Sequence, residues 1–314
     1  MRFAIIDLGT NTFHLLIVER TFGGITTLFK EHLPAKIGKA GINEGIITPE
    51  AINRAVAVLR TYRQKIDEYQ VLLENVKVIG TSAIRNAANQ TAFCQTIFEQ
   101  TGLTVEVISG EREAELIYEG VRRALDLGQN PSLIVDIGGG SVEFIIANAE
   151  RIFWKQSFEI GGQRLLEKFM PADPISPQTV NRLRTYFQQQ LLPLHNAIHQ
   201  YAPGTLVGSS GSFDTLIDVD FMHQFGHLPD PQQTAFELDL EEFQRQYELL
   251  ISGNRAERMA IAGMIELRVD MIVVGVILID YVLKSFDIRH IQCSNYALKE
   301  GVLGWVLNLN SIMQ

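Results

Sequence analysis

Short apolar runs rich in Val and Ile alternate along the chain with longer stretches in which apolar residues recur at helical spacing. The runs are typical of buried strands and the longer stretches of amphipathic helices. Besides two hairpins described below, the pattern predicts strands at residues 24–33, 76–79, 104–108, 151–160, 205–208 and 289–292. It predicts helices at about 49–69, 91–101, 110–125, 162–169, 176–200 and 239–286, a variable loop at 220–236, and a last helix from about 295. Strands that alternate with helices at these lengths predict an α/β fold.

One segment of the sequence occurs twice. Residues 4–18 align with residues 133–147 at an offset of 129 positions. Each copy reads as a strand that ends in Asp, a tight turn and a second apolar strand, which is the pattern of a β-hairpin. Each copy opens about half of the chain, so the repeat predicts two lobes of similar construction. The alignment pairs Asp7 with Asp136, Gly9 with Gly138, and Thr12 with Ser141.

The two turns have the composition of phosphate-binding loops. Their glycines allow positive φ and bring backbone N–H groups close to a ligand, and their hydroxyls add donors. Asp7 and Asp136 would place a carboxylate beside the bound anion, where a hard divalent cation can bridge the two. An ordinary β-turn in which the Asp caps its own backbone is the alternative, and the repetition favours the ligand. The turn residues are Gly9, Thr10, Asn11 and Thr12 in the first copy, and Gly138, Gly139, Gly140 and Ser141 in the second.

Two further segments have residues suited to anions. Arg85 follows the predicted strand 76–79, where its guanidinium could fork onto phosphate oxygens; a solvated first-turn arginine explains it equally well. Another turn lies between strand 205–208 and a helix, so that its amides and the helix dipole would receive an anion. A flexible serine-rich turn is the alternative there. This turn contains Ser209, Ser210, Gly211 and Ser212.

Two glutamates stand out by position. Glu113 shares a helix face with Leu116 and Ile117, whereas Glu111 and Glu115 point away from that face. A partly desolvated carboxylate is a competent general base toward water, so we expect Glu113 to be catalytic. Glu143 lies two residues past Ser141 and can return to the cation that Asp136 binds; an outward, solvated glutamate is the alternative.

Composition and charge argue against nucleic-acid-binding, membrane-spanning and disulfide-bonded proteins. The 314 residues are 46% apolar and 20% charged, which indicates globular cores. With a net charge of −9 and no cluster of Lys and Arg, we expect no nucleic-acid partner. The longest apolar run, 271–279, is far below the roughly 20 residues needed to cross a bilayer, so we expect no membrane partner. Two distant cysteines, with no secretion signal, predict a cytoplasmic protein without disulfides or a zinc site.

Taken together, these motifs resemble the exopolyphosphatase and guanosine pentaphosphate phosphatase family. The resemblance extends from about residue 3 to residue 306. Long members of that family carry an additional C-terminal helical region related to metal phosphohydrolases, and since this sequence ends at Gln314 we expect a short form. The segments that carry the resemblance are 7–14, 80–87, 108–117, 136–143, 208–212, 268–272 and 297–301.

The resemblance implies two actin-like, ribonuclease H-like lobes of the sugar kinase, heat-shock chaperone and actin superfamily, with a substrate cleft between them. The first lobe would comprise residues 1–125 joined by the final helix, 298–314, and the second residues 126–297. It also implies that Glu113 activates water, that Arg85 and the three loops bind phosphates, and that Asp136 and Glu143, with Asp7 nearby, hold Mg²⁺ or another divalent cation. A homodimer is implied as well.

Three functions therefore remain open. The first is a Mg²⁺-dependent phosphohydrolase of inorganic polyphosphate or guanosine pentaphosphate, between which the sequence does not decide. The second is a nucleotide-dependent kinase, because twin Asp-x-Gly hairpins would serve ATP equally well. The third is a non-catalytic phosphate or alarmone sensor. Glu113 favours water over an alcohol acceptor and so a hydrolase over a kinase, and the presence of Glu113, Asp136 and Glu143 together argues against a sensor.

Overall fold

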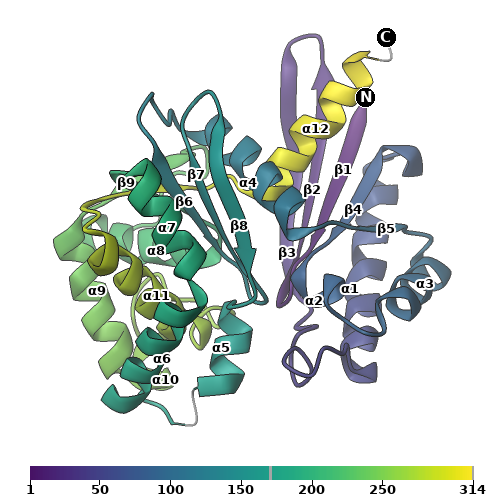
Figure 1. The fold of residues 1–314 in the computed structure, drawn as a ribbon. Coiled ribbons are helices and arrows are strands. Elements are labelled where there is room, and N and C mark those ends of the chain that lie inside the picture. The colour runs from purple at the N-terminus through teal and green to yellow at the C-terminus, as the bar shows by residue number, and fades with distance from the viewer. Residues whose placement is uncertain (170–171, 313–314) are drawn as a thin grey trace. The chain divides into compact units, whose positions relative to one another are not determined.

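The computed structural model describes residues 1–169 and 172–312, which fold into two compact units. Unit 1 comprises residues 1–113 and the end of the chain from Val302, and unit 2 comprises residues 114–301. The divide falls inside helix α4 (Gly110–Ala124) and inside the last helix, α12 (Leu298–Ile312). Residues 313–314 of the expected final helix lie outside the described residues. Each unit is built on one mixed sheet (Figure 1).

The sheet of unit 1 has the strand order β3-β2-β1-β4-β5. Strands β1 (Arg2–Leu8), β2 (Thr12–Thr21) and β3 (Gly24–Pro34) are antiparallel, and β4 (Val76–Gly80) and β5 (Val105–Val107) run parallel to β1. Helices α1 (Pro49–Glu68), α2 (Ser82–Arg85) and α3 (Gln90–Thr101) complete the unit, with a single 3-10 turn at Leu73–Asn75. Thr48 caps α1 as its sequence predicts, accepting a hydrogen bond from the Ala51 amide.

Unit 2 repeats this order and adds one strand at the edge. Its sheet runs β8-β7-β6-β9-β11-β10, from β6 (Ser132–Ile137), β7 (Val142–Ala147), β8 (Ile152–Phe158), β9 (Thr205–Ser209), β10 (Ala235–Leu238) and β11 (His290–Ser294). The two repeated segments form the first hairpin of each unit, so the predicted duplication is confirmed. The helices are α5 (Gly162–Phe169), α6 (Pro177–Gln190), α7 (Leu192–Tyr201), α8 (Gly211–Phe225), α9 (Leu240–Ser252), α10 (Arg255–Met259) and α11 (Met271–Phe286).

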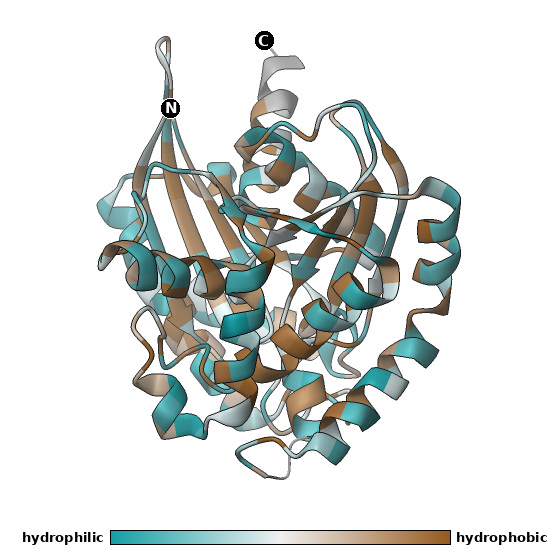
Figure 2. Ribbon diagram, turned by 90° about the vertical axis from the view of Figure 1, so that its left-hand side faces the viewer, coloured by the Kyte–Doolittle hydropathy of each residue, from teal (hydrophilic) through white to brown (hydrophobic). Residues whose placement is uncertain are grey.

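The longest apolar run forms a buried helix. In α11 twelve of the 16 residues are buried, because the helix packs among α5, α6, α8 and α9 in the core of unit 2. Figure 2 shows the same distribution, with hydrophobic strands and hydrophilic surfaces on the outer helices. Among the described residues, no helix is long and apolar enough to span a membrane.

Several boundaries predicted from sequence are wrong. The helix predicted at residues 176–200 is two helices, α6 and α7, and the stretch 239–286 holds three helices, with turns at residues 260–270 between α10 and α11. The variable loop predicted at residues 220–236 is shorter, because α8 continues to Phe225 and leaves only about half of that segment irregular. Helix packing explains the extension, because Phe221 contacts both Phe225 and Phe236. The last helix begins at Leu298 instead of near 295. The Ser294 hydroxyl binds the Tyr296 amide in a local turn, while Glu300 reaches back to the Ala297 amide and fixes the later start.

Candidate functional site

The turn of the second hairpin is fixed by hydrogen bonds that its carbonyl groups accept from the start of α5. The amides of Gly162, Gln163 and Gly161, where α5 begins, donate to the carbonyls of Gly138, Gly139 and Gly140 at 2.9, 2.8 and 3.2 Å. In a trans peptide the carbonyl and the following N–H point in opposite directions. The amides of Gly139, Gly140 and Ser141 therefore face away from α5, and successive amides that point one way form an anion-binding concavity.

Glycine is required where the two segments meet. A Cβ atom on Gly161 would lie 2.4 Å from the carbonyl carbon of Gly140, and one on Gly138 would lie 3.0 Å from the Ser141 carbonyl oxygen. Gly161 was not among the site residues predicted from sequence. Its only signal is a Gly-Gly pair before a helix, which does not show that two backbones touch.

The turn of the first hairpin is held in the same way. The amides of Ala35 and Lys36 donate to the Asn11 carbonyl at 3.0 and 2.8 Å, and the Gly38 amide donates to the Thr10 carbonyl at 3.0 Å. The N–H groups of Asn11 and Thr12 consequently face away from residues 35–38. The Thr12 hydroxyl oxygen is buried and has no hydrogen-bond partner within the described residues. A buried hydroxyl in that state is expected where a ligand completes its bonding.

Two buried carboxylates lie beside the turn of unit 2. Asp136 and Glu143 are directly opposite each other on β6 and β7, so their side chains lie on one face of the sheet, and only 6% and 1% of their surfaces are exposed. Burial raises the pKa of Asp136. The hydroxyls of Ser210 and Ser209 lower this pKa in part, because each donates a hydrogen bond to Oδ2 at 2.7 Å. Glu143 Oε1 accepts hydrogen bonds from the hydroxyls of Ser141 and Ser157.

This pair fits a hard divalent cation only as a partial ligand set. Carboxylate oxygens suit Mg²⁺, which usually binds one or two carboxylates and takes its other ligands from water and substrate phosphates. Within the described parts of the chain, no three His, Cys, Asp or Glu side chains group together as a metal site. Asp7 belongs to unit 1, where its strand neighbour is His14 in place of the second carboxylate, and its metal role stays a prediction.

The third loop, at the start of α8, is attached to Asp136 and is strained. Ser210 has φ 68° and ψ 178°, a region that glycine alone occupies readily. Its hydroxyl bond to Asp136 helps to hold that conformation. A Cβ atom on Gly211 would overlap the guanidinium of Arg268, so this glycine lets the arginine lie flat against the loop. Ser209, Ser212 and Asp136 are all buried here, which brings the second and third predicted loops together.

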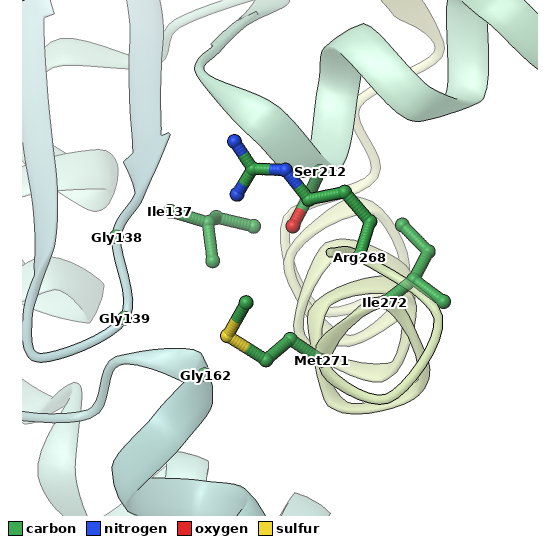
Figure 3. A pocket seen from close by; sticks show the side chains of 8 residues that line it. All are labelled: Ile137, Gly138, Gly139, Gly162, Ser212, Arg268, Met271 and Ile272. Atoms are coloured by element: carbon green, nitrogen blue, oxygen red, sulfur yellow. The ribbon is translucent and has the colours of Figure 1, made fainter. Parts of the chain in front are cut away.

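Arg268 lies between these two loops and was not predicted as a site residue. Figure 3 shows its guanidinium directed toward Ile137 and Gly138, above Met271. With Gly139 and Ser212 these residues line a cavity of about 10 Å³, about the size of one water molecule. Burial lowers the pKa of Arg268, while Asp214 and Asp136 act in the opposite direction. Segment 268–272 carries part of the family resemblance, but neither that resemblance nor the apolar run after Arg268 shows what the arginine faces.

Glu113 and Arg85 form an ion pair in unit 1. As the helical spacing predicts, Glu113 is buried and Glu111 is exposed. Glu115 lies off the buried face, and its Oε1 accepts a hydrogen bond from Lys155 Nζ at 2.7 Å. Arg85 Nη1 lies 2.7 Å from Glu113 Oε2 and 3.3 Å from the Ile108 carbonyl. The guanidinium compensates the charge of a carboxylate that would be costly to bury alone, and it fixes the orientation of that carboxylate.

Amide-lined loops beside buried carboxylates, on two duplicated α/β units, are typical of proteins that bind phosphate groups. Comparison with known proteins identifies the family. The model of the Ppx/GppA phosphatase family matches residues 16–309, and the chain belongs to this family. Membership makes it a phosphohydrolase.

Solved structures extend the comparison over the whole chain. An exopolyphosphatase from Cytophaga hutchinsonii is 45% identical, covers 98% of both chains and has a TM-score of 0.95. A Ppx/GppA family member from Aquifex aeolicus is 25% identical over 100% of this chain and 99% of its own, with a TM-score of 0.79. A Haemophilus influenzae relative is 28% identical over 96% of this chain and 90% of its own length. Together with the strand orders, these similarities confirm the two duplicated α/β units that the sequence predicts.

Proposed function

We propose that this chain is an exopolyphosphatase, which releases the terminal phosphate of inorganic polyphosphate, and that guanosine pentaphosphate is a second substrate to test. The observation that carries the proposal is the turn 138–141, whose carbonyls are tied to α5 so that its amides converge on one side. The 45% identical structure from Cytophaga hutchinsonii is named an exopolyphosphatase, which supports polyphosphate as the substrate.

In this proposal the chemistry is the attack of water on the terminal phosphorus. The water oxygen forms the new P–O bond, the anhydride P–O bond breaks, and Glu113 accepts the proton of the attacking water. Arg85 keeps the Glu113 carboxylate oriented through its 2.7 Å contact. The loop amides and the buried Thr12 hydroxyl bind the phosphate oxygens, whose negative charge is thereby spread over several donors in the transition state.

A divalent cation belongs to the proposal. Asp136 and Glu143 would hold it, and when bound it would neutralise phosphate charge that backbone amides alone leave uncompensated. Because the remaining ligands would be water and substrate, we expect weak binding of metal to the protein alone.

The test is phosphate release from tripolyphosphate, long-chain polyphosphate, guanosine pentaphosphate and ATP, each with Mg²⁺ and with excess chelator. We expect release from polyphosphate that stops on chelation and returns when Mg²⁺ is restored in excess. Full activity in chelator would contradict the metal role of Asp136 and Glu143. Tight binding of polyphosphate with no phosphate released would instead indicate a sensor, and phosphate transfer from ATP to an alcohol would indicate a kinase.

A further inference from the structure

The Gly140 carbonyl is held by a side chain as well as by the backbone. Arg164 Nε donates to this carbonyl at 2.8 Å, more closely than the Gly161 amide at 3.2 Å. The neighbouring carbonyls of Gly138 and Gly139 accept from the backbone amides of α5. Among these hydrogen bonds to the turn carbonyls, the one from Arg164 comes from a side chain, so a substitution can remove it.

The peptide that Arg164 holds is the one that presents the Ser141 amide. Since the carbonyl of Gly140 and the N–H of Ser141 belong to one peptide plane and point in opposite directions, fixing the carbonyl fixes the amide. Gly139 and Gly140 have no side chains that would otherwise limit rotation of this plane. The Ser141 hydroxyl is occupied by Glu143 at 2.7 Å, which leaves the orientation of its amide to the peptide itself.

Arg164 is itself held in place. Its Nη2 lies 2.9 Å from Glu159 Oε2, and its side chain is 14% exposed while that of Glu159 is 42% exposed. The two residues lie on either side of the Gly161–Gly162 pair, so the ion pair closes the same short segment whose amides hold the loop. Arg164 reaches the loop from the carbonyl side, which is opposite to the direction of the amides.

We propose that Arg164 is a positioning residue for the phosphate loop 138–141, and that with Glu159 it sets the orientation of the Gly140–Ser141 peptide before substrate binds. This inference rests on the proposed function of that loop. Preorganised amides bind an anion without the entropy loss of first ordering the loop. Loss of Arg164 should therefore weaken phosphate binding more than it slows the chemical step.

The experiment compares Arg164→Met and Arg164→Lys with wild-type protein. Arg289→Met is the matched control, because Arg289 also pairs with a carboxylate, at 3.0 Å, but is 74% exposed. Three quantities are measured: the Kd of tripolyphosphate with Mg²⁺ by calorimetry, KM and kcat for phosphate release, and the midpoint of thermal unfolding. For Arg164→Met we expect Kd and KM to rise about tenfold, and kcat to change less than about threefold. Arg164→Lys, which keeps a donor, should fall in between, and Arg289→Met should match wild type.

A folded Arg164→Met protein with unchanged Kd and KM would overturn the inference. A large fall in kcat at unchanged KM would also overturn it, because that result assigns Arg164 to the transition state. If Arg164→Met does not fold, Arg164→Lys and Glu159→Gln replace it as the test. A KM about twofold to threefold above that of wild type would support a positioning role of Arg164, and a KM equal to that of wild type would contradict it. A wild-type protein that neither binds tripolyphosphate nor releases phosphate refutes the proposed function, and this inference with it.

Discussion

Ser210 shows most directly that a single residue stores strain at the site. Its backbone lies in a region essentially reserved for glycine, at a cost of about 1–3 kcal/mol for other residues. Ser210→Ala removes the hydroxyl and keeps the strain, whereas Ser210→Gly removes both. We expect the glycine variant to have a free energy of unfolding about 1 kcal/mol higher than the alanine variant. Urea unfolding of the two proteins measures this difference, and equal stabilities would show that the loop is unstrained.

Asp218 should make the protein less stable as pH rises. Burial, with a smaller contribution from Asp214, raises the pKa of this carboxyl from 3.8 to about 6 in the folded protein. Between these values the folded state holds a proton that the unfolded state has released, so the free energy of unfolding falls as pH increases through about 4 to 6. The side chain is partly exposed, and we expect the loss to amount to about 1 kcal/mol.

The variant Asp218→Asn should remove this pH dependence. At pH 7 it should be more stable than wild type by about 1 kcal/mol, and below about pH 4, where the carboxyl is protonated in both states, the advantage should disappear. Glu248→Gln, an exposed carboxyl-to-amide change on α9, serves as the control. Thermal unfolding from pH 3 to 8 is the measurement. A stability gain from Asp218→Asn that is the same at every pH would contradict the assignment.

For single residues, the sequence predicts burial where burial follows from local helical or strand periodicity. Glu113 could be predicted as buried because helix geometry alone places it with Leu116 and Ile117. That Arg85 pairs with Glu113 could not, since the two residues lie 28 positions apart and meet through the packing of separate elements. Arg268 escaped prediction for the same reason.

Among the elements, the junction between the hairpin turn and α5 has the least tolerance for change. Gly161→Ala would place a Cβ within 2.5 Å of the carbonyl carbons of Gly139 and Gly140. We expect it to destabilise the protein by about 1–3 kcal/mol and to raise KM, because the turn must shift. Gly204→Ala, in the same unit with no atom within 4 Å of the added Cβ, should change stability by no more than about 0.5 kcal/mol.

Thermal unfolding and steady-state phosphate release check both glycine variants. A Gly161→Ala protein with the stability and KM of wild type would show that the turn and α5 are not in rigid contact.

Helix boundaries that are marked by capping residues could be predicted to within a few residues. The Thr48-Pro49 start of α1 and the Ser109 cap of α4 are fixed by neighbours in sequence, and the Ser109 hydroxyl accepts from the Arg112 amide at 3.1 Å. The end of α8 depends instead on the contact of Phe221 with Phe236 of β10, which no local pattern encodes. The start of α12 is set by a local bond from the Ala297 amide to Glu300, and the predicted start near residue 295 did not take this bond into account.

Over the whole molecule, the duplication goes further than the aligned sequences. After the third strand of each unit, a short segment donates backbone hydrogen bonds to carbonyls of the first hairpin turn: residues 35–38 in unit 1 and residues 161–163 in unit 2. Backbone amides make these bonds, so the two segments need no common side chains, and the sequence repeat ends before them. The end of the chain belongs to unit 1, where Lys77 and Arg112 each lie 5.1 Å from the ring centre of Trp305.

The central claim is that Glu113 activates water for attack on a phosphate held by these loops. The most direct test is Glu113→Gln beside Glu111→Gln, its exposed neighbour on the same helix. The measurements are single-turnover phosphate release from tripolyphosphate and, separately, the Kd of that ligand. We expect Glu113→Gln to lower the release rate at least about a hundredfold, with Kd changed by less than about threefold, and Glu111→Gln to match wild type. A Glu113→Gln enzyme that releases phosphate at the wild-type rate would contradict the account.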